Sequence, residues 1–557
     1  SSAEGTGTVE LFANDATVYA LIVSENANDK SNPGKIIVNG GNYIADRLTD
    51  SMIFADINEV ITVNGGNFHL DNVGEGPKGN GSPWIFNASG NNQMHINVNG
   101  GTYNANVAKQ HWTYEVKLGE GLTTTNNGDG TWTVVPAVAT VGEETFGSIQ
   151  EAIDAAQNGE TVKLIADVAL DTKKYTTQVD NLVVLFNVKG KAVTFDLNGK
   201  KIDVNASAAN LGGKMLAGVF SADVEGDFTI TDSSAEGTGA VNVTVNDAKV
   251  YSVFISENAG DKTKSGKMTV NAGNFTTVGK VANAMIYADT DKVVTINGGT
   301  FICDGVSVSE NYPWLINTHD NNVKQVIVNG GTFNVDINHQ YRPFEVFVPE
   351  NLAVKANGNG TWTIVPAQAY VTEMLGAWVT EPGDNEHKVG YATVAEAIAA
   401  TNDFGKTVTI LAGDYTGNLN VNKGITVQGE TDENGNNLVK FNGKLNITAD
   451  GATVKNINVN NGSATAAYIG AKDVVVDGCQ VVGGNGFRSC YTSGTVTFKN
   501  SVITGATYGI HFDGSANGNI VIEDCVITGW TSFASTITNV AISGTTFDEG
   551  NHNQLRF

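Results

Sequence analysis

The sequence predicts an all-β chain that folds as a modular, right-handed parallel β-helix, a solenoid closed by short amphipathic capping helices. Three observations predict this fold: a long internal duplication, a short strand-and-turn repeat within each copy, and a recurring interval of 20–24 residues in the last third. The composition agrees, because 65 of the 557 residues are glycine and only 9 are proline, which favours many tight turns. A chain of this length exceeds one compact core, so we expect several units.

The duplication begins at the first residue of the sequence. Ser1–Gly7 and Ser233–Gly239 both read SSAEGTG, 232 residues apart. Further pairs follow in the same order: VYALIVSENA from Val18 and VYSVFISENA from Val250, PWIFN from Pro83 and PWLIN from Pro313, GDGTWTVVP from Gly128 and GNGTWTIVP from Gly358. Such a duplicated module is typical of repeat architectures.

A shorter repeat lies inside each module. It joins an alternating strand to an Asn-Gly-Gly turn and an aromatic residue, as in IIVNGGNY from Ile36, ITVNGGNF from Ile61, INVNGGTY from Ile96, MTVNAGNF from Met268, VTINGGTF from Val294 and VIVNGGTF from Val326. We number positions so that the last apolar strand residue, such as Val38, is position 0. Positions −2 and 0 share one buried face, because side chains alternate along a strand. We expect positive φ at the glycine of position +2 and a return to the interior at the aromatic of position +5.

The last third follows the same pattern with different residues. Position 0 is occupied, at intervals of 22, 22, 24 and 20 residues, by Val454, Val476, Phe498, Ile522 and Ile542. Position +1 alternates in charge before ending in serine, through Lys455, Asp477, Lys499, Glu523 and Ser543. Opposite charges on neighbouring strands attract, so we expect an outward column. Cys479 and Cys525 fall at position +3 and are expected inside as small core residues, because the four cysteines show neither metal spacing nor a disulfide framework.

Two segments carry helical spacing instead of strand spacing. FGSIQEAIDAAQNG predicts a helix at about 146–158, and YATVAEAIAATNDFG predicts another at about 392–403. A helix can cover the open end of a solenoid, so each one marks a new start. We therefore expect an N-terminally incomplete unit at 1–136, its duplicate at 137–366 and a C-terminal solenoid at 367–557.

These segments also carry a family resemblance. The stretch VATVGEETFGSIQEAIDAAQNGETVKLIADVALD, with VTFDLNGKKIDV from Val193, resembles β-helix modules of large surface proteins in gut Bacteroidetes-type and other host-associated bacteria. The part from TVAEAIAA through AGDYTGNLNVNKGITVQGE to Phe547 looks like the pectin-lyase-like superfamily with its parallel β-helix repeats. The resemblance implies a secreted or surface protein of adhesin type. It specifies the fold more than the activity, because this fold hosts lyases, hydrolases, tailspikes and adhesins.

The catalytic motifs of pectin-lyase-like enzymes do not occur in the sequence. The Asn-Thr-Asp, Asp-Asp, Gly-His-Gly and Arg-x-Lys motifs of polygalacturonases are absent. The nearest counterpart of a pectate-lyase site is Arg488 in NGFRSC with His511 and Asp513 in YGIHFDG, on strands that align as neighbours. The alternative is an exposed arginine, a strand histidine and an Asp-Gly turn. Because paired carboxylates are missing, we expect no catalysis and keep these three residues as the weaker, catalytic alternative.

Aromatic residues are the candidates for ligand contact. Trp84 and Trp314 are equivalent in the duplication, Tyr312 lies beside the second, and sugars stack on such rings. Each tryptophan also sits in an apolar strand, WIF or WLI, so a core role is the alternative. The polar inserts Asp71–Ser82 and Asp304–Tyr312 precede them and form the expected binding ridge, with tolerated surface loops as the other reading.

Acidic residues recur in turns and raise the question of calcium. They are Glu25, Asp56, Glu257, Asp289 and Asp320. A column of carboxylates could hold Ca²⁺, but turn propensity also explains them and no calcium-loop motif is present. We expect no cofactor, with Ca²⁺ as the alternative.

The charge and the architecture together limit the function. With 58 acidic and 33 basic residues the formal charge is −25, which repels nucleic acid and anionic lipid. No run is long enough for a membrane helix and no signal peptide is seen in this segment, so the location is inferred from the architecture as extracellular or cell-surface. We expect a non-catalytic adhesin that binds a glycan or a host or cell-surface protein. The alternatives are a carbohydrate-active enzyme, either a polysaccharide lyase or a glycoside hydrolase, that uses the C-terminal solenoid, and a structural stalk.

Overall fold

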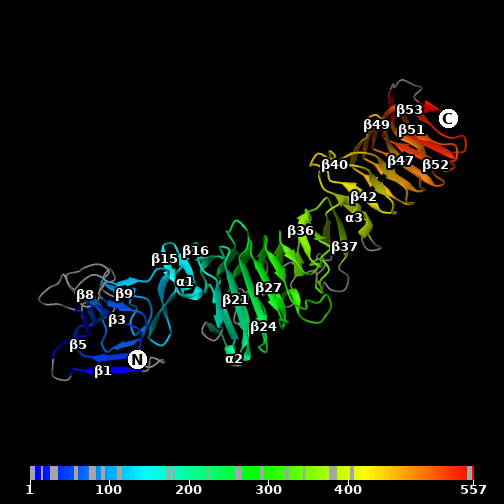
Figure 1. The fold of residues 1–557 in the computed structure, drawn as a ribbon. Coiled ribbons are helices and arrows are strands. Elements are labelled where there is room, and N and C mark those ends of the chain that lie inside the picture. Colours follow the sequence, from blue (N-terminus) through cyan, green and yellow to red (C-terminus); the bar gives the residue numbers. More distant parts are fainter. Residues whose placement is uncertain are drawn as a thin grey trace. The chain divides into compact units, whose positions relative to one another are not determined.

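The computed structural model describes residues 7–13, 17–24, 35–55, 61–74, 83–88, 95–109, 116–171, 177–179, 182–222, 225–256, 266–288, 294–319, 325–342, 345–374, 386–401, 407–548 and 555–556. Strands make up 55% of the described residues, which also hold three helices, so the all-β prediction is confirmed (Figure 1). Among these residues, no helix combines the length and the hydropathy that a bilayer crossing requires. The chain divides into two compact units, 1–282 and 283–557, which are described separately below.

The first module of unit 1 consists of three ladders of parallel strands (Figure 1). The first ladder is β1 (Thr8–Phe12), β4 (Asn42–Asp46), β7 (Asn67–Leu70) and β10 (Thr102–Tyr103). The second is β2 (Val18–Ser24), β5 (Leu48–Ala55) and β8 (Trp84–Ala88). The third is β3 (Ile36–Val38), β6 (Ile61–Val63), β9 (Ile96–Val98) and β11 (Val116–Leu118). Val38 is paired with Val63 and Val63 with Val98, so the position-0 residues of successive repeats lie side by side.

The aromatic residues of position +5 do return to the interior. The ring centroids of Tyr43 and Phe68 lie 4.9 Å apart and those of Phe68 and Tyr103 lie 5.0 Å apart, with interplanar angles of 9°. Phe68 and Tyr103 are fully buried. Burying a side chain of this size stabilises a fold by about 1.5–3 kcal/mol, and each stacked pair adds about 0.5–1.5 kcal/mol.

The Asn-Gly-Gly turns differ from the prediction in one respect. Positive φ occurs at the second glycine, position +3, with 113° at Gly41, 125° at Gly66 and 113° at Gly101, so the expectation of positive φ at position +2 is wrong in this module. The first glycine is required for another reason. A Cβ atom on Gly100 would lie only 2.5 Å from the carbonyl oxygen of Asn64 in the preceding repeat.

The asparagine of the same turn forms a side-chain ladder. Nδ2 of Asn64 donates to Oδ1 of Asn39 at 2.8 Å, and Nδ2 of Asn99 donates to Oδ1 of Asn64 at 2.9 Å. Each amide satisfies its neighbour, and this bonding explains why the turn keeps asparagine at position +1.

The remainder of unit 1 has two antiparallel hairpins, then a helix, and then parallel ladders. After the hairpin β12 (Leu122–Asn126) and β13 (Trp132–Pro136) come β14 (Ala139–Val141), β15 (Glu144–Phe146) and α1 (Ile149–Ala155). The ladders are β16 (Glu160–Leu164), β20 (Ala192–Asp196), β23 (Asp227–Thr231) and β26 (Lys267–Val270); β17 (Val168–Asp171), β21 (Lys201–Ala206), β24 (Ala240–Val245) and β27 (Asn274–Val278); and β19 (Leu182–Asn187), β22 (Met215–Ser221) and β25 (Phe254–Ser256). The predicted helix is confirmed: Oγ of Ser148 caps it by accepting from the amide of Glu151, and Ile149, Ala152 and Ile153 are its buried face. A short helix, α2 (Ala208–Leu211), was not expected.

Unit 2 contains the strands that follow residue 283. Its first part holds β28 (Ala284–Ala288) and β31 (Trp314–Thr318); β29 (Val294–Ile296), β32 (Val326–Val328) and β34 (Val346–Phe347); and β30 (Thr300–Ile302) and β33 (Thr332–Phe333), followed by the hairpin β35 (Leu352–Ala356) and β36 (Trp362–Pro366). The second predicted helix is α3 (Val394–Ala400), which packs against β37 (Ala369–Met374) and starts with a capping box between Thr393 and Glu396.

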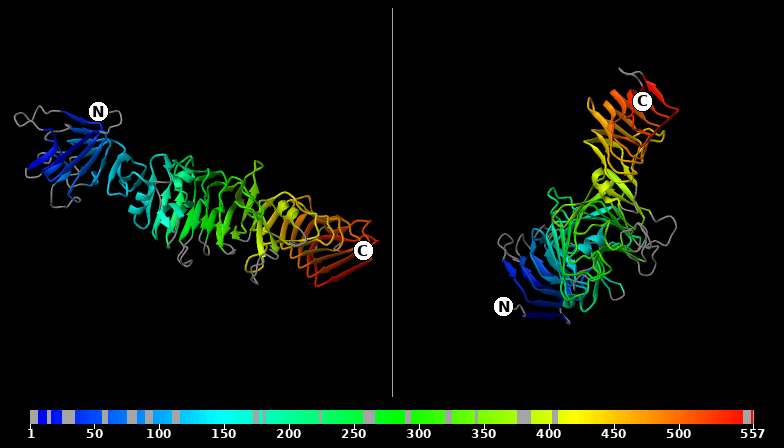
Figure 2. Two further views of the ribbon diagram at one scale, coloured as in Figure 1. Left: turned by 90° about the horizontal axis from the view of Figure 1, so that it is seen from below. Right: turned by 90° about the vertical axis from the view of Figure 1, so that its right-hand side faces the viewer.

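The C-terminal strands lie side by side in stacked rows (Figure 2), and their pairing shows the predicted register. The ladder runs through β39 (Thr407–Ile410), β42 (Thr426–Gly429), β45 (Thr453–Lys455), β48 (Val474–Asp477), β50 (Thr495–Lys499), β52 (Asn519–Glu523) and β54 (Asn539–Ser543). Each position-0 residue faces the next, and the charge column is confirmed: Nζ of Lys499 and of Lys455 lie 3.5 and 4.0 Å from Oδ2 of Asp477. Here position +2 does adopt positive φ, at Asn456, Gly478, Asn500, Asp524 and Gly544. Cys479 and Cys525 are buried, and all four cysteines are free thiols.

Candidate functional site

The candidate site is a group of aromatic, basic and histidine side chains on three neighbouring strands of unit 2. Arg488 is on β49 (Gln480–Cys490), Tyr508 and His511 are on β51 (Val502–Phe512), and Trp530 is on β53 (Val526–Ser532). Tyr508 is paired with Trp530 in the ladder, so the two rings come from equivalent places on adjacent strands. The two rings are partly exposed, whereas Phe487 on β49 and Ile510 on β51 are buried.

The rings and the arginine form one stack. The centroids of Tyr508 and Trp530 lie 5.1 Å apart at an interplanar angle of 13°. Cζ of Arg488 lies 5.2 Å from the Tyr508 centroid, and the His511 ring lies 4.7 Å from it. Because a guanidinium over an aromatic face is held by the ring quadrupole, Arg488 is positioned without an acidic partner.

A shift in the strand register changes which residue lies opposite Asp513. Phe487 pairs with Ile510, but the register then shifts and Cys490 pairs with Phe512. The shift coincides with Ser489, whose φ is 54°. The simple alignment of GFRSC with GIHFD, which would place Asp513 opposite Cys490, is therefore wrong by one residue. Asp513 is exposed, and its Oδ1 accepts a hydrogen bond from the amide of Gly514.

His511 is held in one orientation and is uncharged near neutral pH. Its Nδ1 accepts from the amide of Ser489 at 3.3 Å, which leaves Nε2 as the protonated nitrogen. Burial is the largest cause that holds the pKa of His511 below its usual range; Arg488 lowers it further and Asp513 opposes them. His511 is partly exposed, and the N–H of a neutral imidazole can donate a hydrogen bond to a ligand.

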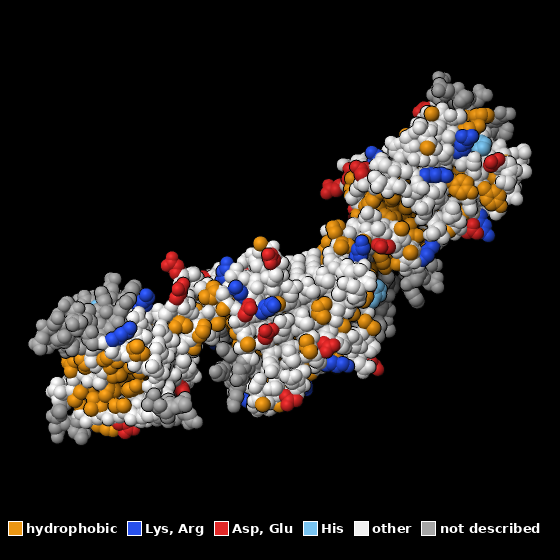
Figure 3. Space-filling view, viewed as in Figure 1, with side chains coloured by type: hydrophobic (Ala, Val, Ile, Leu, Met, Phe, Trp, Pro, Cys, Tyr) orange, Lys and Arg blue, Asp and Glu red, His pale blue; other side chains and the backbone are white. Residues whose placement is uncertain are grey.

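The chemistry of the site is that of a hydrogen-bond donor surface. The Arg488 side chain is exposed and makes no ion pair with any residue that the structure describes. Basic, histidine and hydrophobic side chains lie next to one another over these C-terminal strands (Figure 3). The arrangement can bind hydroxyl or oxyanion groups, and it offers no pair of carboxylates for general acid and base roles.

The aromatic residues chosen from the sequence have different surroundings. Tyr312 is half-exposed, whereas Trp314 is buried and its Nε1 donates to the carbonyl of Ser309 at 2.8 Å. The Trp314 ring lies between Tyr312 and Tyr341, at centroid distances of 4.4 and 5.0 Å. Of this pair only Tyr312 is available at the surface, and its role as a ligand contact stays a prediction. Trp84, the counterpart of Trp314, is partly exposed at the start of β8.

Sequence reasoning missed a buried polar group beside Trp314. Cζ of Arg342 lies 5.0 Å from the Trp314 ring, and its Nη1 lies 3.4 Å from Oε1 of Glu345, which is completely buried. Oε2 of Glu345 accepts from the amide of Thr318, and Gln340 bonds both backbone groups of Ile316. A signal was present, because the spacing of Gln340 and Glu345 recurs at Gln110 and Glu115 in the first module.

The five acidic residues that could bind calcium lie in parts of the chain that the structure does not describe. Glu25, Asp56, Glu257, Asp289 and Asp320 all lie outside the described residues. Within the described ranges, no group of three or more histidine, cysteine, aspartate or glutamate side chains is arranged to hold a metal ion.

Comparison of the sequence with known proteins identifies no related protein. No family model matches the sequence, and no curated protein matches it.

Proposed function

We propose that this chain is an extracellular or surface-located protein of adhesin type, built from right-handed parallel β-helices, which binds a glycan or a surface partner without transforming it. The observation that carries the proposal is the stack of Arg488, Tyr508 and Trp530, with His511 beside it, on the outer side of adjacent strands. Aromatic edges and directed N–H donors suit a hydroxylated ligand.

The strand pairing supports the β-helix part of the proposal. In 407–548 the strands pair in parallel with strands about one repeat further along, in three ladders that the chain visits in turn; two of these ladders join at β49. A chain that does this must circle between the ladders, and parallel crossovers are right-handed in about 98% of cases. The pectin-lyase-like resemblance of the sequence points the same way.

A binding assay tests the function. The full chain is applied to a panel of neutral and acidic glycans and to immobilised mucin, with Arg488→Ala and Tyr508→Ala beside the unaltered protein. We expect binding that either substitution weakens at least tenfold. Lys499→Ala is the control, because it removes an exposed positive charge from the other ladder. Absence of binding to any glycan or surface would reject the proposal.

A second candidate is a polysaccharide-cleaving enzyme, favoured by the uncharged His511 beside Arg488. Each glycan is therefore also examined for new reducing ends and for unsaturated products after prolonged incubation. Product formation that Arg488→Ala or His511→Ala abolishes would replace the binding proposal with this one.

A further inference from the structure

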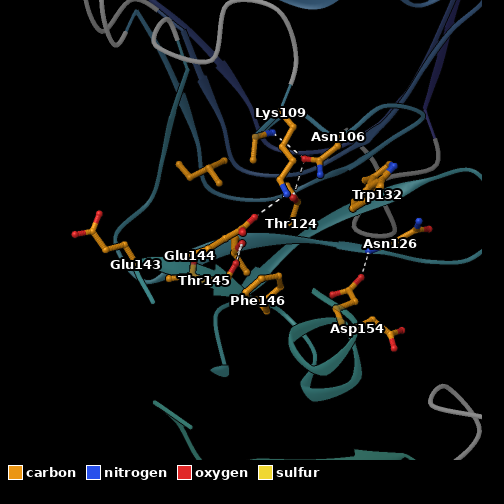
Figure 4. Close-up of a pocket in the computed structure, with 14 residues that line it drawn as sticks. Asn106, Lys109, Thr124, Asn126, Trp132, Glu143, Glu144, Thr145, Phe146 and Asp154 are labelled. Atoms are coloured by element: carbon orange, nitrogen blue, oxygen red, sulfur yellow. Dashed lines mark hydrogen bonds and ion pairs between the residues drawn. The ribbon is translucent and has the colours of Figure 1, made fainter. Parts of the chain in front are cut away.

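A cavity of about 480 Å³ lies in unit 1, where the hairpin β12–β13 meets β15 and the start of α1 (Figure 4). Thr123, Thr124 and Asn126 line it from β12, and Trp132 lines it from β13. Phe146 lines it from β15. This volume falls in the range of about 300–1,000 Å³ that small-ligand pockets occupy.

The duplication provides an internal comparison for these residues. The hairpin β35–β36 has the same register as β12–β13, since Leu122 pairs with Pro136 and Leu352 with Pro366. The fold-determining residues are kept, and Trp132 corresponds to Trp362.

The polar residues of the cavity wall are not kept. The equivalents of Thr123, Thr124 and Asn126 are Ala353, Val354 and Ala356. The hairpin therefore forms without these hydroxyl and amide groups. In the first hairpin Oγ1 of Thr123 donates to the carbonyl of Thr145 at 3.0 Å, and Oδ1 of Asn126 accepts from the amide of Gly128 at 2.8 Å. The hydroxyl lone pairs and Nδ2 of Asn126 can still bond a ligand.

The wall offers more hydrogen-bond acceptors than donors. Four carboxylates and one ammonium group line the cavity, and the ammonium of Lys109 already pairs with Glu144 at 2.7 Å. Oδ1 of Asn106 accepts from Oγ1 of Thr124 and from the amide of Ala108, while its Nδ2 donates to no described residue. The carboxylates repel an anionic ligand but can accept hydrogen bonds from the hydroxyl groups of a neutral one. Nδ2 of Asn106 can donate to the oxygen atoms of the same ligand.

We infer that this cavity is a binding site for a neutral, hydroxyl-rich ligand of one or two sugar rings. The C–H face of such a ligand packs on Trp132, and its hydroxyl groups donate to the wall carboxylates and accept from Asn106. The site is separate from the stack at Arg488, so either can fail without the other.

The test exchanges the wall residues for those of the second hairpin. Maltose, cellobiose and lactose are titrated into the full chain by calorimetry, with glucuronate and spermidine as charged probes. We expect a neutral disaccharide to bind, and the triple variant Thr123→Ala, Thr124→Val, Asn126→Ala to bind it at least tenfold more weakly. The control is Asp129→Asn, which also introduces the second hairpin's residue but lies in the turn outside the cavity wall.

Folding of each variant is checked by circular dichroism and thermal melting. Asn106→Ala alters no hairpin residue and should weaken binding as well, so a poorly folded triple variant would not remove the test. Absence of disaccharide binding, unchanged binding in the variants, or a preference for glucuronate or spermidine would each overturn the inference.

Discussion

Glu345 and Arg342 form a partly buried ion pair beside the last strand of a sheet, with Oε1 of the glutamate 3.4 Å from Nη1 of the arginine. Burial is the largest cause that raises the pKa of Glu345 to about 7, and Arg342 and Thr318 oppose the rise. The carboxyl group of an unfolded chain titrates near 4.5.

The first prediction concerns the pH dependence that follows. Between about pH 4.5 and 7 the folded chain holds a proton on Glu345 that the unfolded chain has lost, so this contribution to stability is complete below pH 4.5 and disappears as pH rises through 7. At about 1.4 kcal/mol per pKa unit the change amounts to roughly 3 kcal/mol. Urea unfolding at pH 5 and pH 8 should show that Glu345→Gln removes this decline. Glu350→Gln, at a half-exposed carboxylate, is the control; an unaltered pH dependence in Glu345→Gln would contradict the prediction.

The second prediction concerns the edge of β31. Oε1 of Gln340 accepts from the amide of Ile316 at 3.3 Å, and its Nε2 donates to the carbonyl of Ile316 at 3.2 Å, as a neighbouring strand would. Gln340→Ala should cost about 1–3 kcal/mol through unsatisfied backbone groups. It should also promote association, because an open edge pairs with other strands. Light scattering at increasing concentration measures this, with the exposed neighbour His339→Ala as the control; a monomeric Gln340→Ala protein of unchanged stability would refute the edge role.

The third prediction concerns the charge column. Asp477→Lys would place three lysines in succession on adjacent strands. The attraction of Asp477 to Lys455 and Lys499 would be replaced by repulsion. These side chains are partly exposed, so we expect a loss of only about 0.5–1.5 kcal/mol. The loss should shrink in 1 M salt, where charges are screened. A loss of the same size at low and high salt would show that packing and not charge is responsible.

The fourth prediction compares two glycines with positive φ. A Cβ on Gly101 (φ 113°) would lie 2.7 Å from Oη of Tyr103 and 3.1 Å from the carbonyl of Gly66, whereas Gly128 (φ 80°) has no atom within 4 Å. Gly128→Ala should cost about 1 kcal/mol from backbone strain alone. Gly101→Ala should cost clearly more, because the stacked Tyr103 must also move. Denaturant unfolding of both variants decides this, and equal losses would contradict it.

The register of the C-terminal ladder could be predicted because its position-0 residues recur at nearly constant intervals. A shift of one residue would turn a whole face of Val454, Val476 and Phe498 outward, so only one register buries the core. The stack of Tyr508 on Trp530 could not be predicted in this way. The ladder has register shifts between Gly483 and Asn485 and after Tyr508, and a constant offset fails across them.

The turns also have one feature that the sequence predicts and one that it does not. Both turn types contain a residue that tolerates positive φ. In the first module, where the asparagines form a ladder, that residue is at position +3, and in the last third it is at position +2. The position that adopts positive φ depends on the contacts of the turn with the neighbouring repeat. The residues of one repeat do not contain that information.

The sequence by itself determined the all-β class, the duplication, the helices α1 and α3 and the outward charge column, because these follow from local periodicity and from repeat-to-repeat identity. The tertiary structure alone decided that Gln340 and Glu345 close a strand edge, that Arg488 stacks on Tyr508, and that Thr124 faces a cavity. Each of these contacts joins segments whose separation depends on bulges, loops and hairpins. Side-chain alternation fixes which face a residue occupies, but only the folded chain sets what lies opposite it.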